Sequence, residues 1–118
     1  MTLERYYSVL EKHSAHNLGS GGLNVLSTPM LVAYLENISY LHCQELLFED
    51  MTTVGSHIAV DHLAPTVIGD EVRITITAVK KTNRRFEFEL EAFDSKKQIA
   101  RATHTRVIVN KNKFMERL

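Results

Sequence analysis

One nearly apolar stretch of the chain carries a threonine and a carboxylate whose types and spacing could support chemistry. The segment VLSTPMLVAYLENISYL, residues 25–41, places Thr28 before a proline and holds Glu36 as its only acidic residue. An activated hydroxyl is a nucleophile, and a carboxylate can accept or return its proton. On a helix, eight residues rise by about 12 Å, so these two groups cannot hydrogen-bond directly. An intervening group or a second subunit would have to connect them.

A histidine further along the chain is a candidate proton carrier. His62 lies in VDHLAPTVIG, on the apolar side of an alternating segment, where it could face Glu36. Each of these residues also has a structural interpretation. Thr28 could cap a helix, Glu36 could be satisfied by an ion pair or hydrogen bond at a dimer interface, and His62 could be an ordinary core or edge histidine.

Metal and phosphate sites are not predicted. In HIAVDH, a strand would place His57 and Asp61 on one face and His62 on the other, so three ligands would not converge. The GSGG motif before the apolar segment lacks the lysine of a phosphate-binding loop and the full dinucleotide fingerprint, which favours a flexible loop. We therefore expect no metal and no cofactor.

Composition limits the class of protein. With 118 residues and 44% hydrophobic content, the chain is expected to form one domain over residues 1–118. Fourteen basic and fourteen acidic residues balance, which argues against nucleic acid or an anionic membrane as partners. A single cysteine, Cys43, permits no intrachain disulfide and favours the cytoplasm. The charged N-terminal segment predicts no secretory signal, and no apolar run reaches the length of a membrane span.

The elements that would position these residues follow from apolar periodicity. Residues 3–12 are expected to form a strand, and residues 29–48 a helix with Pro29 at its first position. Because that helix is apolar on nearly all sides apart from Glu36, it should be buried.

Beyond residue 51 the apolar period changes to two, which predicts strands with one wet face. The residues expected on the buried face are Val54, Ile58, Val60 and His62, then Val72, Ile74, Ile76 and Ala78, then Phe86, Phe88 and Leu90. A last strand is expected over residues 98–109, after turns at KKTNRR and DSKK. The pattern indicates an α+β architecture in which a meander of four consecutive strands curves around the helix. Such a sheet has an edge strand that a second subunit could cover.

Several strings resemble the fluoroacetyl-CoA thioesterase-like family. They are GSGGLNVLSTPMLVAYLE, TTVGSHIAVDHLAPTVIGDEV, EFELEAFD and ATHTRVIVNKNKFMERL, and their order and spacing extend from Gly19 almost to the C-terminus. The resemblance implies the hot dog fold, an antiparallel sheet wrapped around one long central helix. It also implies that Thr28, Glu36 and His62 are catalytic, and that Gly55 lies beside the acyl carbonyl of the substrate.

The function implied by this resemblance is hydrolysis of a small acyl-CoA thioester by a homodimer, with coenzyme A entering only as part of the substrate. Arg106 shares the parity of His104 in THTRVIV and could bind a carboxylate or phosphate. The family usually shields its site with bulky apolar residues upstream of the threonine, whereas SGGLNVLS here implies a more open entrance, so the acyl group is not implied. Two alternatives stay open. A hydratase or dehydratase would not need Thr28, and a non-catalytic acyl-CoA binding protein would leave the ester intact.

Overall fold

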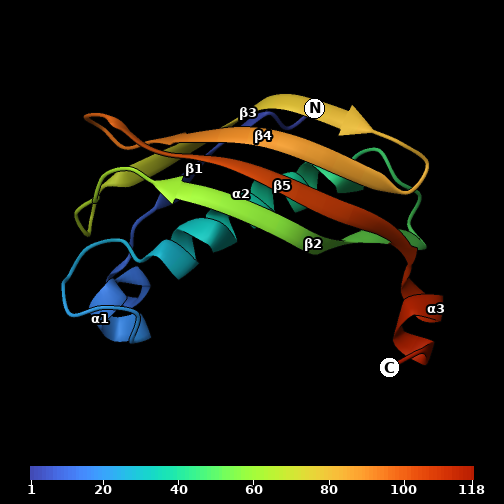
Figure 1. The fold of residues 1–118 in the computed structure, drawn as a ribbon, viewed down its shortest axis with the longest axis horizontal. Helices are drawn as coiled ribbons and strands as arrows, with labels where there is room; N and C mark the ends of the chain where they lie inside the picture. The colour runs from blue at the N-terminus through green and yellow to red at the C-terminus, as the bar shows by residue number, and fades with distance from the viewer.

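A curved antiparallel sheet packs around one long helix. The computed structural model describes residues 1–118, and the sheet has the strand order β1-β3-β4-β5-β2. Its strands are β1 (Glu4–Ser8), β2 (Met51–His62), β3 (Glu71–Lys81), β4 (Arg85–Phe93) and β5 (Gln98–Asn110). The long helix α2 (Thr28–Gln44) lies on the inner side of the sheet, and the short helices α1 (Ala15–Leu18) and α3 (Lys111–Glu116) extend from its two ends (Figure 1). This confirms the predicted α+β class and the wrapping of a sheet around a central helix.

The core forms where one face of α2 meets alternate residues of the central strands. Phe86, Phe88 and Leu90 of β4 point inward and are at most 2% exposed, while the glutamates between them face outward. The helix contributes Leu31, Leu35 and Ile38, all fully buried. Each such side chain stabilises the fold by about 1.5–3 kcal/mol relative to exposure, which fixes the helix against the sheet.

The predicted meander is correct for β3, β4 and β5 but wrong for β2. Strand β2 does not pair with β3, its neighbour in sequence; it pairs with β5 and forms an edge of the sheet. Residues 63–70 connect β2 to β3, and three interstrand spacings amount to only about 14 Å, which a chain of this length spans easily. Apolar alternation indicates which face of a strand is buried, and it carries no information about which strand lies alongside.

Two β-bulges change the predicted faces. The register of β2 shifts between Gly55 and His57. As a result Ile58 packs against the core, whereas Val54 lies on the other face of the strand. A second shift in β3 brings Val79 to the core instead of Ala78. Both predictions assumed an uninterrupted period of two, and one extra residue reverses that parity.

Helix α2 differs from the prediction at both ends. The N-cap is Ser27, whose hydroxyl accepts a hydrogen bond from the Met30 amide, so Thr28 is not the cap. The helix ends at Gln44 rather than residue 48, because the Gln44 side chain donates to the Met51 carbonyl and ties the following turn to β2.

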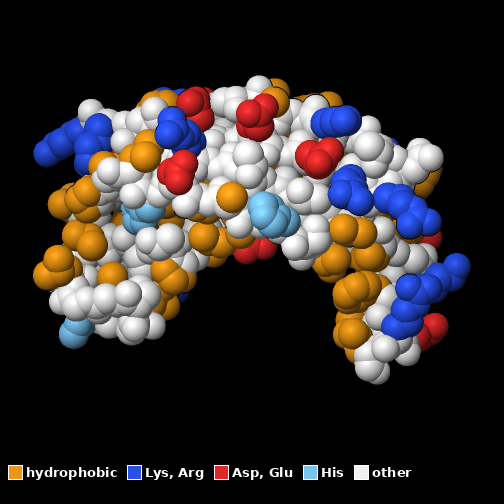
Figure 2. Space-filling model, in the orientation of Figure 1, with side chains coloured by type: hydrophobic (Ala, Val, Ile, Leu, Met, Phe, Trp, Pro, Cys, Tyr) orange, Lys and Arg blue, Asp and Glu red, His pale blue; other side chains and the backbone are white.

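The single chain buries only one side of α2. Ala33, Asn37 and Tyr40 are exposed, and Val32 and Glu36 are partly exposed, although the sequence predicts a helix that is buried on nearly all sides. The space-filling view shows an arch with a hollow beneath it and apolar side chains along the inner side of its right-hand leg (Figure 2). No helix of the structure is both long and apolar enough to cross a bilayer.

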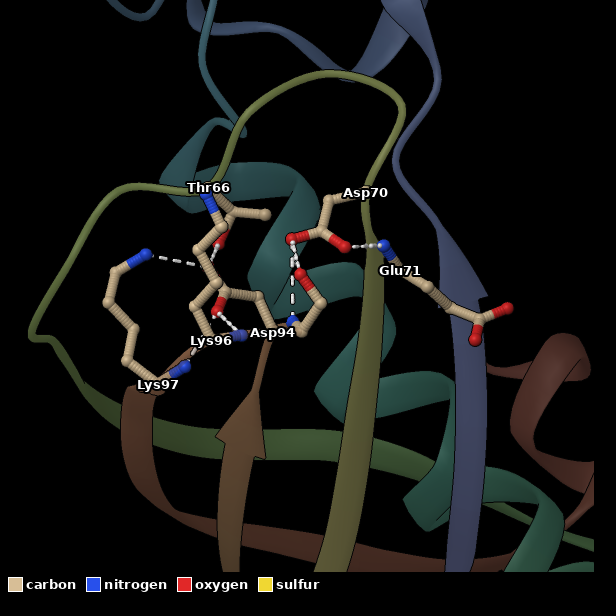
Figure 3. Close-up of polar contacts among 7 residues, drawn as sticks. Thr66, Asp70, Glu71, Asp94, Lys96 and Lys97 are labelled. Carbon is tan, nitrogen blue, oxygen red and sulfur yellow. Dashed lines mark hydrogen bonds and ion pairs between the residues drawn. The ribbon is translucent and has the colours of Figure 1, made fainter.

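A polar cluster ties the β4–β5 turn to the β2–β3 connection (Figure 3). The Asp94 carboxylate accepts hydrogen bonds from the Thr66 hydroxyl at 3.1 Å and from Lys97 Nζ at 2.7 Å. The Asp70 carboxylate accepts a bond from the Ser95 hydroxyl at 2.9 Å. This cluster holds the connection in the place where it meets the start of α2.

Candidate active site

Thr28 and His62 meet at the N-terminal end of α2. The distance between Thr28 Oγ1 and His62 Nδ1 is 2.7 Å. Backbone bonds set this approach: the Leu26 amide donates to the Thr66 carbonyl, and the Leu63 amide donates to the Ile99 carbonyl. Because Ser27 serves as the cap, the Thr28 hydroxyl is free to face the imidazole. We call these two residues the threonine half of the site.

The environment of His62 favours a neutral imidazole. Burial lowers the pKa of His62, and an interaction with the Ala64 carbonyl opposes that effect only in part. Nε2 of the ring is buried and has no hydrogen-bond partner. A cavity of about 320 Å³ adjoins the pair and is lined in part by Ser20, Pro29 and Leu63. A neutral ring nitrogen facing a hydroxyl beside a cavity can act as a general base.

Glu36 lies in a second group of polar residues further along α2. Its carboxylate is 3.7 Å from the Arg106 guanidinium, measured from Oε2 to Nη1. It also lies against Gly55, where a Cβ atom would come within 2.8 Å of Glu36 Oε2. The Glu36 side chain is 42% exposed in the single chain, although the helix that carries it was predicted to be buried on nearly all sides. We call Glu36, Gly55, His104 and Arg106 the glutamate half of the site.

Arg106 is buried, with only 7% of its surface exposed. Its Nε donates to the Thr53 hydroxyl at 2.8 Å and its Nη2 to the Thr53 carbonyl at 3.1 Å. Its Nη1 lies 3.2 Å from Nε2 of His104, and the guanidinium lies over the Tyr40 ring at 5.9 Å. The carboxylate that Arg106 meets therefore belongs to Glu36 of the same chain.

The two halves do not converge within one chain. Thr28 and Glu36 are both on α2 and are separated by about 12 Å of helical rise. Gly55 and His62 are both on β2, with seven intervening peptide bonds and about 20 Å of strand between them. His62 thus contacts Thr28 and not Glu36 of its own chain. The predicted site residues form two separate groups: Thr28 with His62, and Glu36 with Gly55 and Arg106.

Sequence reasoning missed His104, a member of the glutamate half, and Thr53, which holds Arg106 from outside that group. The signal for His104 was register: Ile58 lies opposite His104 on β5, and Gly55 lies opposite Arg106. That register includes the β2 bulge, which alternation alone does not reveal.

The GSGG motif forms a hydrogen-bonded turn at the end of α1. Gly19 ends α1 with φ of 76°, a left-handed conformation that favours glycine. The Ser20 and Gly21 amides both donate to the Ala15 carbonyl. Because these amides are satisfied within the turn, they are not presented to a phosphate.

Comparisons with known proteins agree on one family. A family model described as fluoroacetyl-CoA-specific thioesterase matches residues 9–112. A search of curated protein sequences found no match. A crystal structure of a mutant of the fluoroacetyl-CoA-specific thioesterase FlK, in complex with fluoroacetate and CoA, has a TM-score of 0.89 at 21% identity, over 97% of this chain and 94% of that chain.

Two further solved structures have the same fold. A hot-dog-like protein from Thermanaerovibrio acidaminovorans has a TM-score of 0.86 at 23% identity, covering 97% of this chain and 84% of that chain. A hypothetical protein of Thermus thermophilus, described as a thioesterase superfamily member, has a TM-score of 0.87 at 22% identity, with 97% and 85% covered. These likenesses show that the sheet and α2 form a hot dog fold.

Proposed function

Because the chain belongs to the fluoroacetyl-CoA-specific thioesterase family, we propose that it hydrolyses small acyl-CoA thioesters with Thr28, His62 and Glu36 as catalytic residues. Hydrolysis of an acyl-CoA thioester is the activity of this family, and the chain is a thioester hydrolase. The assignment of residues rests above all on the 2.7 Å contact between Thr28 Oγ1 and His62 Nδ1.

In the first step, the threonine half attacks the thioester. The Thr28 oxygen forms a bond to the acyl carbon while its proton passes to Nδ1 of His62, which the lowered pKa keeps ready to accept it. The resulting oxyanion collapses and breaks the carbon–sulfur bond. The departing thiolate of coenzyme A takes the proton from His62, and the acyl group stays on Thr28 as an ester.

In the second step, water releases the acid. The half-exposed carboxylate of Glu36 accepts a proton from a water molecule as its oxygen bonds to the acyl carbon. The Thr28 oxygen then leaves and takes the proton that Glu36 accepted from the water, and the free acid departs. Gly55, which has no side chain, allows the acyl carbonyl to approach the backbone beside Glu36. The reaction needs no metal or cofactor beyond the coenzyme A of the substrate.

The two halves come together in a homodimer. Strand β2 is a long edge strand, and such an edge is a template for pairing with another chain. Beside it, α2 presents the partly exposed apolar side chains of Val32, Ala33 and Tyr40. A second copy of the chain would cover both surfaces at once, which supports a two-fold symmetric pairing.

The register of this pairing follows from the positions of the two halves. If two β2 strands pair antiparallel about a two-fold axis at Ala59, the extra residue of the bulge brings His62 of one chain opposite Gly55 of the other. Directly opposed residues in an antiparallel pair point to the same face. The threonine half of one protomer would then adjoin the glutamate half of its partner, and each dimer would hold two composite sites.

The substrate is a small acyl-CoA thioester, and the acyl group extends beyond fluoroacetyl. The solved FlK complex contains fluoroacetate and CoA. In this chain the segment before Thr28 carries Gly21, Gly22 and an exposed Leu23, which supports a wider entrance. A cytoplasmic location is in keeping with the thiol of Cys43, which is buried and unpaired.

A thiol-release assay tests this proposal. The purified protein is supplied with acyl-CoA thioesters of increasing chain length, beside the Thr28→Ala, Glu36→Ala and His62→Ala variants. We expect turnover by the wild type that all three folded variants lose, and a chain-length profile that identifies the acyl group. Retention of thiol release by Thr28→Ala would favour direct attack of water on the thioester, and thioester binding without thiol release would favour a hydratase or a binding protein.

A further inference from the structure

His104 is an interior histidine that no step above uses. It is 2% exposed and lies on β5 between the sheet and α2. The groups facing it are the guanidinium of Arg106 on its own strand, the carboxylate of Glu36 on α2, the backbone and side chain of His57 on β2, and the Phe88 ring on β4 at 6.3 Å. Both of its ring nitrogens have polar neighbours.

These neighbours determine which ring nitrogen carries the proton. Nδ1 of His104 lies 2.7 Å from the His57 carbonyl oxygen, which can only accept, so Nδ1 must donate. Nε2 lies 3.2 Å from Nη1 of Arg106, which can only donate, so Nε2 must accept. The imidazole is therefore neutral, with its proton on Nδ1 and its lone pair facing the arginine.

Each of the two bonds holds a different part of the glutamate half. The bond from Nδ1 reaches the carbonyl of His57, at the bulge that places Gly55 against Glu36. The bond at Nε2 fixes Nη1 of Arg106, the guanidinium nitrogen that is 3.7 Å from Glu36 Oε2. Thr53 already holds Nε and Nη2, so His104 supplies the remaining constraint on the guanidinium.

We propose that His104 is a positioning residue that holds Arg106 against Glu36 through the lone pair on Nε2, and that it must be neutral to do so. The inference rests on the proposed function because it gives Glu36 a part in the reaction. If Nε2 of His104 carried a proton, it would face Nη1 of Arg106 as a second donor, and two positive charges would be adjacent. Burial is the largest effect on the pKa of His104 and lowers it. The His57 carbonyl and the Glu36 charge raise this pKa and the Arg106 charge lowers it, and the net shift is downward, as expected for a ring that is neutral near neutral pH.

Two amide substitutions at His104 test its bond to Arg106 and its bond to the His57 carbonyl separately. His104→Gln places an amide oxygen near the position of Nε2 and can still accept from Arg106, whereas His104→Asn places its amide near Nδ1 and retains only the bond to His57. We expect His104→Gln to keep most of the wild-type kcat and His104→Asn to lose about 10- to 100-fold, because small displacements of catalytic groups are costly. His16→Gln, at an exposed histidine of α1, is the matched control.

The dependence of kcat/KM on pH would not change if His104 had a purely structural role. In the wild type, protonation of His62 and His104 should both reduce kcat/KM in acid, which produces a two-proton limb. In His104→Gln only His62 remains, and the limb should become a one-proton limb. Equal kcat values for the Gln and Asn variants, or an unchanged limb, would overturn the proposal.

Ring nitrogen NMR of the wild-type protein decides the matter if the variants fail to fold. We expect the His104 signals of a neutral ring protonated on Nδ1, together with slowly exchanging Arg106 guanidinium protons that are lost when the ring titrates. A ring protonated on Nε2 at neutral pH would contradict the proposal. This measurement needs no turnover, so it is independent of the assay with Thr28→Ala that tests the proposed function.

Discussion

Thr28 and His62 are separated by 34 residues in the sequence, yet Thr28 Oγ1 lies 2.7 Å from His62 Nδ1. The preceding residue, Ser27, takes the structural task of capping α2. Two adjacent hydroxyls therefore have different roles, which makes them a natural pair for comparison.

Substitution of these two hydroxyls should have opposite effects. Ser27→Ala should lower the free energy of unfolding by about 1 kcal/mol through loss of the cap and leave kcat near the wild-type value. Thr28→Ala should reduce kcat by at least about 100-fold with little change in stability, since the hydroxyl makes no cap bond. Thermal unfolding and thiol release on the same preparations distinguish the two. If Thr28→Ala lowered stability and left kcat unchanged, Thr28 would have a structural and not a catalytic role.

Activity should increase with pH through the acid range. The general base must be neutral to accept the Thr28 proton, and burial lowers the pKa of His62 below its usual value of 6.5. We therefore expect kcat/KM to fall only when the pH drops well below neutrality and to be flat at neutral pH. A profile of thiol release between about pH 5 and pH 8 measures this, and an acid limb centred above 6.5 would contradict it.

Mixing of inactive chains should restore activity. In the proposed homodimer, the Thr28→Ala and Glu36→Ala variants each lack one half of both sites, but a mixed dimer contains one site with both halves intact. After equilibration of equal amounts, about one quarter of wild-type turnover is expected, because half of the dimers are mixed and each has one complete site. Native mass spectrometry, which distinguishes the mixed dimer from both homodimers by mass, checks that exchange has occurred. If exchanged dimers show no recovery, the two halves act within one chain.

Gly55→Ala should reduce activity more than stability. The added methyl group would lie 2.8 Å from Glu36 Oε2, and the flexible, half-exposed glutamate can move away from it at little cost to folding. We expect kcat to fall by about tenfold or more through displacement of the carboxylate. In a Glu36→Ala background the same substitution should have no further effect on kcat. Additive losses in that double variant would show that Gly55 acts independently of Glu36.

Asp94 should make stability depend on pH. Burial raises its pKa, but hydrogen bonds from Lys97, from the turn amides and from Thr66 outweigh this and lower the pKa from 3.8 to about 2. Because the folded-state pKa is below the unfolded value, the contribution of this carboxylate is complete above about pH 4 and is lost as the pH falls toward 2. Asp94→Asn should cost about 1–2 kcal/mol at neutral pH.

Denaturant unfolding at several pH values measures this contribution. Asp61→Asn is the matched control, since Asp61 forms only an exposed pair with Arg101. It should change stability less, and without the loss in acid. An Asp94→Asn variant as stable as the wild type would show that the turn does not depend on the charge.

The sequence was sufficient for the elements but not for their neighbours. Alternation identified Phe86, Phe88 and Leu90 as core, because burial on one face of a strand imposes a period of two. Alternation could not predict that β2 pairs with β5, because strand pairing depends on how the connecting segment crosses the sheet. Likewise a hydroxyl and a carboxylate in an apolar helix made Thr28 and Glu36 candidates, and the family resemblance gave them their expected roles. His104 was missed because its partners come from three other segments.

The bulge in β2 has a consequence for how this chain tolerates changes of length. Gly55 and His62 differ by an odd number of positions, so in a regular strand they would point to opposite faces, yet the register shift between Gly55 and His57 turns both toward α2. Deletion of Ser56 would leave Gly55 and His62 six positions apart, so regular pairing would still turn both toward α2, together with Ile58 and Val60. A single-codon deletion at the bulge would therefore preserve the faces that the proposed site needs, whereas deletion of Ala59, beyond the bulge, would turn His62 to the outer surface.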